Sequence, residues 1–252
     1  MKGPIIFFSF FVIMLISLEA NASLVSENYS SPLGETAPSK IYITKKVFNE
    51  ELSLMQKRFS FLAEEKKYTL EIYPDWDATT WANALARRWP PEDQIIVYSG
   101  LAYRKEFLTD TLALGVCHEL GHLYGGVPYS DNYNQISGEG QADYWATTNC
   151  FVEAMNLFDY KDDDSTPRIA VKNFCETQTK FSSALCIRLL KAVERLGSFF
   201  AHNAKLPEPH FETPDQGVVN QTVLTHNDPQ CRVDTFMAGL FGGDRPKCWY
   251  KF

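Results

Sequence analysis

The 252-residue sequence has no run of more than two basic residues, and its formal net charge is -7. Proteins that bind nucleic acid usually carry clustered positive charge, so nucleic acid is not an expected partner. After residue 22 the sequence also lacks an apolar run of the roughly 20 residues that a transmembrane helix needs. No internal repeat is visible. With 45% hydrophobic and 22% charged residues, the chain has the composition of a folded globular protein.

The first 22 residues have the three parts of a secretory signal peptide. Lys2 is the positive start, residues 5–18 are apolar, and Ala20-Asn21-Ala22 fits the small-residue rule for cleavage. Cleavage there would make Ser23 the first residue of a flexible, polar lead-in over residues 23–40. An uncleaved membrane anchor is the alternative. We therefore predict an exported protein, periplasmic or secreted, with no stable membrane span after cleavage.

All six cysteines lie after residue 22, and an even number in an exported chain predicts disulfides. The pairs Cys175–Cys186 and Cys231–Cys248 would close short local loops. A third bridge, Cys117–Cys150, would tie together two helices that carry charged motifs. Buried free thiols are the alternative.

Hydrophobic periodicity and turn residues predict a single α+β domain over residues 41–252, with a small mixed sheet. Helices are expected over 47–66, 108–124, 139–158 and 171–196, and strands over 68–73, 80–86 and 95–98. Residues 161–164 are expected to form a solvated loop, and residues 202–220 are Pro-rich and irregular.

The helix expected over 108–124 contains His118-Glu119-Leu120-Gly121-His122, an H-E-x-x-H motif. Residues four apart project from the same face of a helix, so the two imidazoles can bind one Zn²⁺. Glu119 lies beside that face, where it can act as a general base on water at the metal. The alternative is two core histidines with an accidental Glu between them, and three fixed residue types rarely meet by chance in a chain of this size.

A catalytic zinc site needs a third protein ligand and an open position. A third histidine six residues after His122 would be one solution, but Pro128 stands there. Glu139 and Asp143 lie four apart on the next helix, so Glu139 can be the ligand while Asp143 accepts a hydrogen bond from the far nitrogen of His118. Asp131, on a nearer loop, is a competing ligand. Two solvated acids at a helix start are the remaining alternative.

The order of these motifs resembles that of gluzincin metallopeptidases of the HtpX and CAAX-prenyl-protease type. The shared pattern is an N-A segment, a strand ending in Gly-Leu, an H-E-L-G-H helix and an E-x-x-A-D-x-x-A helix, found here at 83–84, 96–101, 118–122 and 139–146. Further along, Thr225-His226 and Arg232 are similar to the family's T-H-P and following Arg, with two residues inserted before the Pro. The gap of 16 residues between the second His and Glu139, the cysteines and the missing membrane helices set this sequence apart.

The resemblance implies a zincin-like metallopeptidase fold, with H-E-x-x-H on one helix and E-x-x-x-D on the next. It also implies one Zn²⁺ held by His118, His122 and Glu139, with Glu119 as the catalytic base. By the same resemblance, His226 would donate a hydrogen bond to the oxyanion and Arg232 would hold the carboxylates of the site. Residues Trp81, Asn83 and Ala84 would belong to an exposed edge strand that binds a peptide by strand addition.

The expected activity is that of a zinc-dependent endopeptidase, with a protein or peptide as substrate. A zinc-containing binding or chaperone-like module without turnover is the alternative. Glu119 argues against this alternative, because a structural zinc needs no general base and usually has four protein ligands.

Overall fold

The computed structural model describes residues 21–25, 40–158 and 163–252 of the chain. The expected signal peptide up to residue 20 and residues 26–39 of the expected lead-in lie outside the described residues. Within the described part, no helix combines the length and the apolar character needed to cross a membrane.

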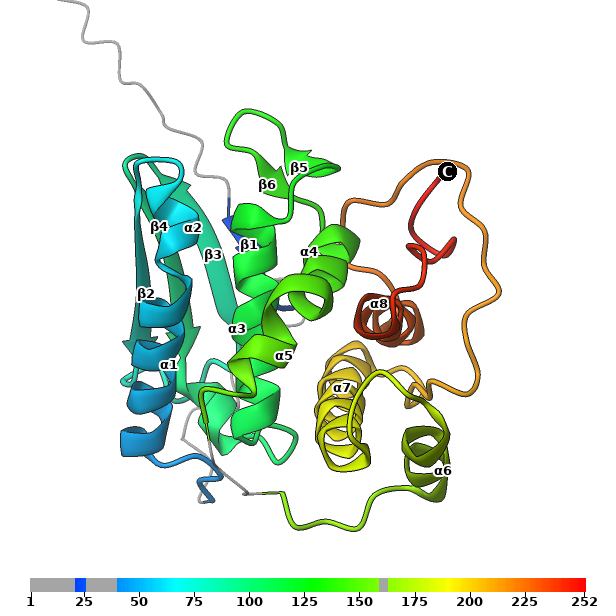
Figure 1. Ribbon diagram of the computed structural model, residues 1–252. Coiled ribbons are helices and arrows are strands. Elements are labelled where there is room, and N and C mark those ends of the chain that lie inside the picture. The colour runs from blue at the N-terminus through cyan, green and yellow to red at the C-terminus, as the bar shows by residue number, and fades with distance from the viewer. Residues whose placement is uncertain (1–20, 26–39, 159–162) are drawn as a thin grey trace, which may run out of the picture.

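A mixed four-stranded sheet forms one side of the molecule (Figure 1). β2 (Thr69–Asp75) pairs in parallel with β4 (Glu92–Tyr98), and β4 pairs antiparallel with β3 (Ala84–Trp89). β1 (Asn21–Ser23) pairs antiparallel with the other edge of β3, so the strand order is β1-β3-β4-β2. Buried and less buried positions alternate along β3 and β4, which is typical of a sheet with one covered face.

Two helices cover that face of the sheet. α1 (Lys45–Phe59) begins where the Thr44 hydroxyl accepts a hydrogen bond from the backbone N–H of Val47, and it continues into the short α2 (Phe61–Glu64). The 3₁₀ turn η1 (Ser99–Tyr103) then leads to α3 (Thr109–Tyr124), which is buried from Thr109 to Leu123. A helix buried on all sides lies between two layers, and α3 separates the sheet from the remaining helices (Figure 1).

The other layer is helical. A two-stranded hairpin of β5 (Tyr129–Asp131) and β6 (Ile136–Ser137) leads from α3 to α4 (Glu139–Trp145). The chain then passes through a π-helical turn, η2 (Ala146–Cys150), into α5 (Phe151–Ala154), so the single helix expected over 139–158 is interrupted. The layer is completed by α6 (Ile169–Thr177), α7 (Ser183–Ala204) and α8 (Pro229–Phe241).

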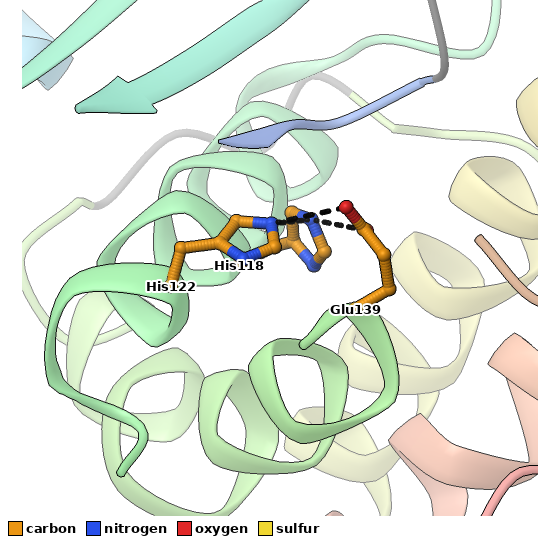
Figure 2. A group of neighbouring side chains, drawn as sticks. All are labelled: His118, His122 and Glu139. Atoms are coloured by element: carbon orange, nitrogen blue, oxygen red, sulfur yellow. Dashed lines mark hydrogen bonds and ion pairs between the residues drawn. The ribbon is translucent and has the colours of Figure 1, made fainter. Parts of the chain in front are cut away.

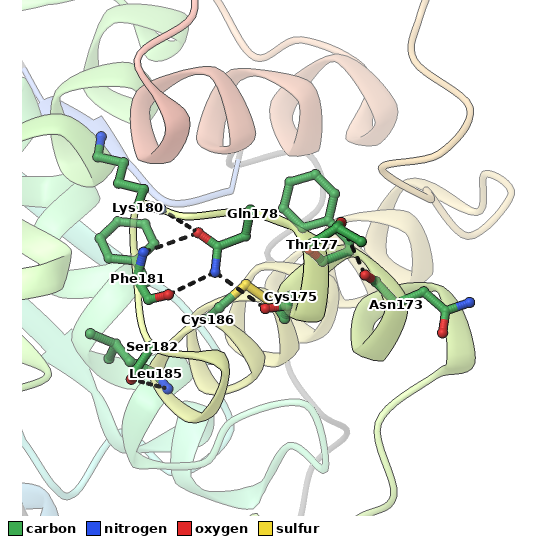
Figure 3. Close-up of a disulfide and its surroundings, with 10 residues drawn as sticks. Asn173, Cys175, Thr177, Gln178, Lys180, Phe181, Ser182, Leu185 and Cys186 are labelled. Carbon is green, nitrogen blue, oxygen red and sulfur yellow. Dashed lines mark hydrogen bonds between the residues drawn. A yellow bond between two sulfur atoms is a disulfide. The ribbon is translucent and has the colours of Figure 1, made fainter.

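The helix expected over 171–196 is in fact two helices, because a polar loop separates α6 from α7 (Figure 3). The side-chain oxygen of Gln178 accepts hydrogen bonds from the backbone N–H groups of Lys180 and Phe181, and its amide nitrogen donates to the Cys175 and Phe181 carbonyls. Ser182 then caps α7 by accepting a hydrogen bond from the Leu185 N–H. The loop therefore satisfies its backbone groups without helical bonds.

Three further expectations need correction. Ser23 is in β1 and Leu24 and Val25 are buried, so these residues are part of the fold and not of a flexible lead-in. The strand expected over 80–86 begins only at Ala84, because the preceding residues form a turn and an irregular approach. In addition, α8 was not expected, because its weakly amphipathic pattern is surrounded by Pro and Gly.

All three expected disulfides are present. Cys117–Cys150 joins α3 to η2, Cys175–Cys186 joins α6 to α7, and Cys231–Cys248 joins α8 to the C-terminal segment. The described residues contain no free cysteine. The first bridge connects α3, which carries the H-E-x-x-H motif, to the turn that follows α4, the helix of Glu139 and Asp143.

Candidate metal centre

Three buried side chains converge between α3 and α4 (Figure 2). The Nε2 atoms of His118 and His122 are 3.0 Å apart, and the carboxylate oxygens of Glu139 lie 3.4 Å and 3.5 Å from them. Tetrahedral coordination with bonds of about 2.0–2.2 Å places neighbouring ligand atoms roughly 3.4 Å apart. The three groups can therefore hold one metal ion.

The hydrogen bonds of the far ring nitrogens orient both imidazoles for this role. His122 Nδ1 donates to the Ser137 carbonyl at 2.9 Å, and His118 Nδ1 donates to the Asp143 carboxylate at 2.7 Å. In the neutral rings these bonds place the proton on both Nδ1 atoms, so both Nε2 lone pairs face the centre. Two facing lone pairs beside a carboxylate form a set of donors suited to a cation.

The two imidazoles differ in pKa, because only His118 contacts the Asp143 carboxylate. Burial lowers the pKa of His122 to about 4, and the neighbouring His118 contributes to this shift. Burial also opposes protonation of His118, but the charge and hydrogen bond of Asp143 outweigh it and raise its pKa to about 9. Burial alone would raise the pKa of Glu139, yet the nearby imidazoles hold it well below its usual range.

Asp143 is held in place by Arg232 of α8. The guanidinium donates from Nε and Nη2 to the two carboxylate oxygens, each at 2.8 Å, and it stacks on the Phe200 ring 3.6 Å from the centroid. Both charged groups are buried, and Arg232 keeps the pKa of Asp143 below its ordinary value despite that burial. This bidentate pair fixes the carboxylate that orients His118.

Glu119 lies in a different environment. Its side chain is fully buried, and no other side chain donates a hydrogen bond to its carboxylate among the described residues, where the backbone N–H of Ala86 is the group that partly stabilises its charge. Burial raises the pKa of Glu119 to about 8, although the charge of His118 partly opposes this shift. A buried carboxyl group whose charge is so little stabilised is costly for stability, and such groups are enriched where proton transfer is required.

The close approach of α3 and α4 depends on Gly121, inside the H-E-x-x-H motif. A Cβ atom at this position would lie 2.5 Å from the Ala142 carbonyl oxygen. Any other residue would therefore push the helix that carries Glu139 away from the two histidines.

At the end of α3, Arg88 donates to the Leu123 carbonyl and forms a buried ion pair with Asp93, which ties the helix to the β3–β4 hairpin.

The structure brings His226 and Arg232 to the same site. His226 Nε2 is 3.4 Å from a carboxylate oxygen of Glu139, and burial lowers its pKa, which favours a neutral ring. Asp131, the competing ligand, is not in the metal-binding group. Its carboxylate instead accepts hydrogen bonds from the backbone N–H groups of Tyr133 and Asn134 in a turn.

The expected peptide-binding strand is positioned differently from the prediction. Trp81 is 44% exposed and lies outside β3, whereas Asn83 and Ala84 are buried. The edge of β3 is covered by β1, and Asn83 forms hydrogen bonds with both backbone polar groups of Val25. The contribution of residues 21–25 differs from the prediction, which assigned residues 20–22 to a cleavage site and residues 23–40 to a flexible lead-in.

Comparisons of the chain with family models, curated proteins and solved structures gave no match.

Proposed function

We propose that this protein is an exported zinc-dependent endopeptidase with a zincin-like fold, of the gluzincin type that the sequence resembles. One observation carries the proposal: two oriented imidazoles and a carboxylate converge beside Glu119, which is fully buried and receives no hydrogen bond from another side chain of the described residues. A purely structural metal site does not require a buried carboxylate next to its ligands.

Zinc is the metal that this donor set favours. Two neutral imidazoles and one carboxylate are the protein ligands of a common class of catalytic zinc sites, which leaves a position for water or substrate. When bound, zinc would polarise a peptide carbonyl and make water acidic enough to attack it near neutral pH.

The protein's own groups have separate roles in the proposed reaction. Glu119 accepts a proton from the attacking water and delivers it to the leaving amine. His226 donates from Nε2 to the carbonyl oxygen as negative charge develops, a contribution of about 2.7–4 kcal/mol for one well-placed donor. Asp143 and Arg232 keep His118 in the ligating tautomer.

The edge of β3 on which β1 lies is the peptide-binding surface in this proposal, so another peptide would bind there in place of β1. Ala84 presents its backbone carbonyl and Asn83 its side-chain amide on the side of the strand away from β4. Strand addition gives affinity through main-chain hydrogen bonds and tolerates many sequences. Export is supported by the three disulfides, which form and persist in oxidising compartments.

The test compares the wild type with Glu119→Gln on an unfolded protein substrate, with the zinc content of both measured. We expect both to bind one zinc ion per chain, because Glu119 is not a ligand, and we expect the variant to lose activity by about 10²–10⁴-fold. Asp131→Asn is the matched control and should keep full activity. Equal hydrolysis by wild type and Glu119→Gln would contradict the proposal, as would a zinc-loaded wild type without hydrolysis.

A further inference from the structure

We infer that the first peptide on which the site acts is the chain's own segment 21–25, and that the bond cleaved is the one between Ser23 and Leu24. This inference rests on the proposed function. Its starting observation is that β1 lies on the edge of β3, beside the three metal-binding side chains (Figure 2).

The backbone of this segment is held like a bound peptide. Leu24 N–H donates to the Ala84 carbonyl at 3.0 Å, and Arg232 Nη1 donates to the Leu24 carbonyl at 2.9 Å. Val25 N–H donates to the Asn83 side-chain oxygen at 3.1 Å, and the Asn83 amide donates to the Val25 carbonyl at 3.2 Å. Each backbone polar group of the two residues after the bond is therefore bound by a residue of the site.

The carbonyl of Ser23 has a different partner. It accepts a hydrogen bond from His226 Nε2 at 2.8 Å, and the same nitrogen is 3.4 Å from the Glu139 carboxylate. The carbonyls of Leu24 and Val25 are engaged elsewhere, so among these three residues only Ser23 presents its carbonyl to the oxyanion donor proposed above. This contact selects the Ser23–Leu24 peptide bond.

The side chain of Leu24 is anchored on the helix that carries the histidines. Leu24 is fully buried, and its Cδ2 lies 3.6 Å from the position of a Cβ built on Gly115, one turn before His118. A cavity of about 120 Å³ adjoins Val25, with Phe200, His226 and Arg232 among its walls. The site thus binds a large aliphatic side chain immediately after the cleaved bond.

The reaction consumes one water molecule. The water oxygen forms a bond to the Ser23 carbonyl carbon, the bond from that carbon to the Leu24 nitrogen breaks, and Glu119 carries the proton from water to this nitrogen. The products are a carboxylate on Ser23 and an amine on Leu24. Until then, segment 21–25 covers the edge of β3 that another peptide would need.

The decisive test is the N-terminal residue of the full chain, expressed in an exporting host and loaded with zinc. We expect wild type to begin at Leu24 and Glu119→Gln to begin at Ser23 or earlier. Because each molecule would cleave its own segment, the rate at which wild type is processed should not depend on protein concentration. The signal-peptide rule instead predicts Ser23 in both proteins.

The outcomes separate the two proposals. If wild type begins at Ser23 or earlier but hydrolyses an added peptide, the inference is wrong and the proposed function stands. If both proteins begin at Leu24, another enzyme makes the cut and the inference is also wrong. If zinc-loaded wild type neither processes itself nor cleaves an added peptide, the proposed function falls as well.

A second readout needs neither zinc nor activity. In zinc-free Glu119→Gln, we expect the Val25 amide to be protected from hydrogen exchange. Adding Leu24→Asp to this variant should increase the exchange of that amide by about tenfold or more, because the new carboxylate would be buried without a partner. Leu24→Met, which conserves volume, should keep the protection. Rapid exchange of the Val25 amide in zinc-free Glu119→Gln would show that segment 21–25 does not occupy the site.

Discussion

At the scale of single residues, Asp143 performs two tasks. Its fully buried carboxylate accepts a hydrogen bond from His118 Nδ1 and neutralises the buried charge of Arg232. Both carboxylate oxygens of Asp143 therefore already accept hydrogen bonds, and the orientation of His118 depends on them. A change here should act on the metal through His118 and not through direct ligation.

We predict that Asp143→Asn lowers metal affinity by about 10–100-fold, because an amide no longer stabilises the Nδ1–H tautomer as a carboxylate does. The measurement is a competition titration of the folded protein against a chelator of known affinity. Asp131→Asn, a carboxyl-to-amide change in a turn outside the metal-binding group, is the control and should leave affinity unchanged. A similar loss in both variants would show that Asp143 has no specific role.

At the scale of elements, the two ligand-bearing helices are connected by several independent constraints. Gly121 lets α3 and α4 approach closely, and Cys117–Cys150 joins α3 to the π-helical turn that follows α4. The extra residue of a π-helical turn changes which side chains face inward, and such turns often occur at functional sites. The geometry of the three donors therefore depends on how these elements are fastened together.

Removing Cys117–Cys150 by a double change to Ala should reduce both stability and metal affinity. The bridge closes a separation of 33 residues, for which chain entropy gives about 4 kcal/mol. Removing Cys175–Cys186, with a separation of 11 residues, should cost about 3 kcal/mol. This second variant is the control, because its bridge lies between α6 and α7 and its loss should not change metal affinity.

Urea unfolding and chelator competition measure these two effects separately. The prediction would be contradicted if both double variants lost the same metal affinity, or if loss of Cys117–Cys150 changed stability alone.

At the scale of the whole molecule, the site lies where the sheet layer and the helical layer meet. β3 and β1 contribute from one layer, α4 and α8 from the other, and α3 lies between them. Asp163 contributes to the helical layer by binding Lys191 Nζ at 2.9 Å and Arg195 Nε at 2.8 Å, both on α7. This residue was expected in a solvated loop, but it anchors the segment that leads to α6.

We predict that Asp163→Asn destabilises the protein by about 1 kcal/mol at pH 7, a modest value because solvent screens a partly exposed pair. Burial alone would raise the pKa of Asp163, but hydrogen bonds from Arg195, Ser165 and Lys191 lower it below the usual 3.8. A lowered folded pKa means that the stabilisation is complete above about pH 4 and is lost as the pH falls. The measurement is the urea midpoint of wild type and of Asp163→Asn at pH 7 and at pH 2.5. The difference between the two midpoints should be larger at pH 7, and an equal difference at both pH values would contradict the prediction.

Much of the fold class and of the metal-binding group was predictable from the sequence, because the signals are local. A spacing of four residues places His118 and His122 on one face of any helix, and the same rule pairs Glu139 with Asp143. The β-branched and aromatic residues 95–98 and the periodicity of residues 47–59 likewise predict elements that are present. The interruptions were not predictable in this way, since η2 and the loop after α6 are stabilised by contacts that periodicity does not report.

By itself, the sequence determined which residues share a helix face and that the six cysteines can pair, because both follow from spacing and number. Only the tertiary structure decided that Glu139, and not Asp131, joins the two histidines, because the path of the intervening hairpin sets which carboxylate reaches them. It also decided that α8 brings Arg232 to Asp143 and that residues 21–25 pair with β3. These contacts join residues far apart in the chain, so they depend on how whole layers pack, which no local pattern encodes.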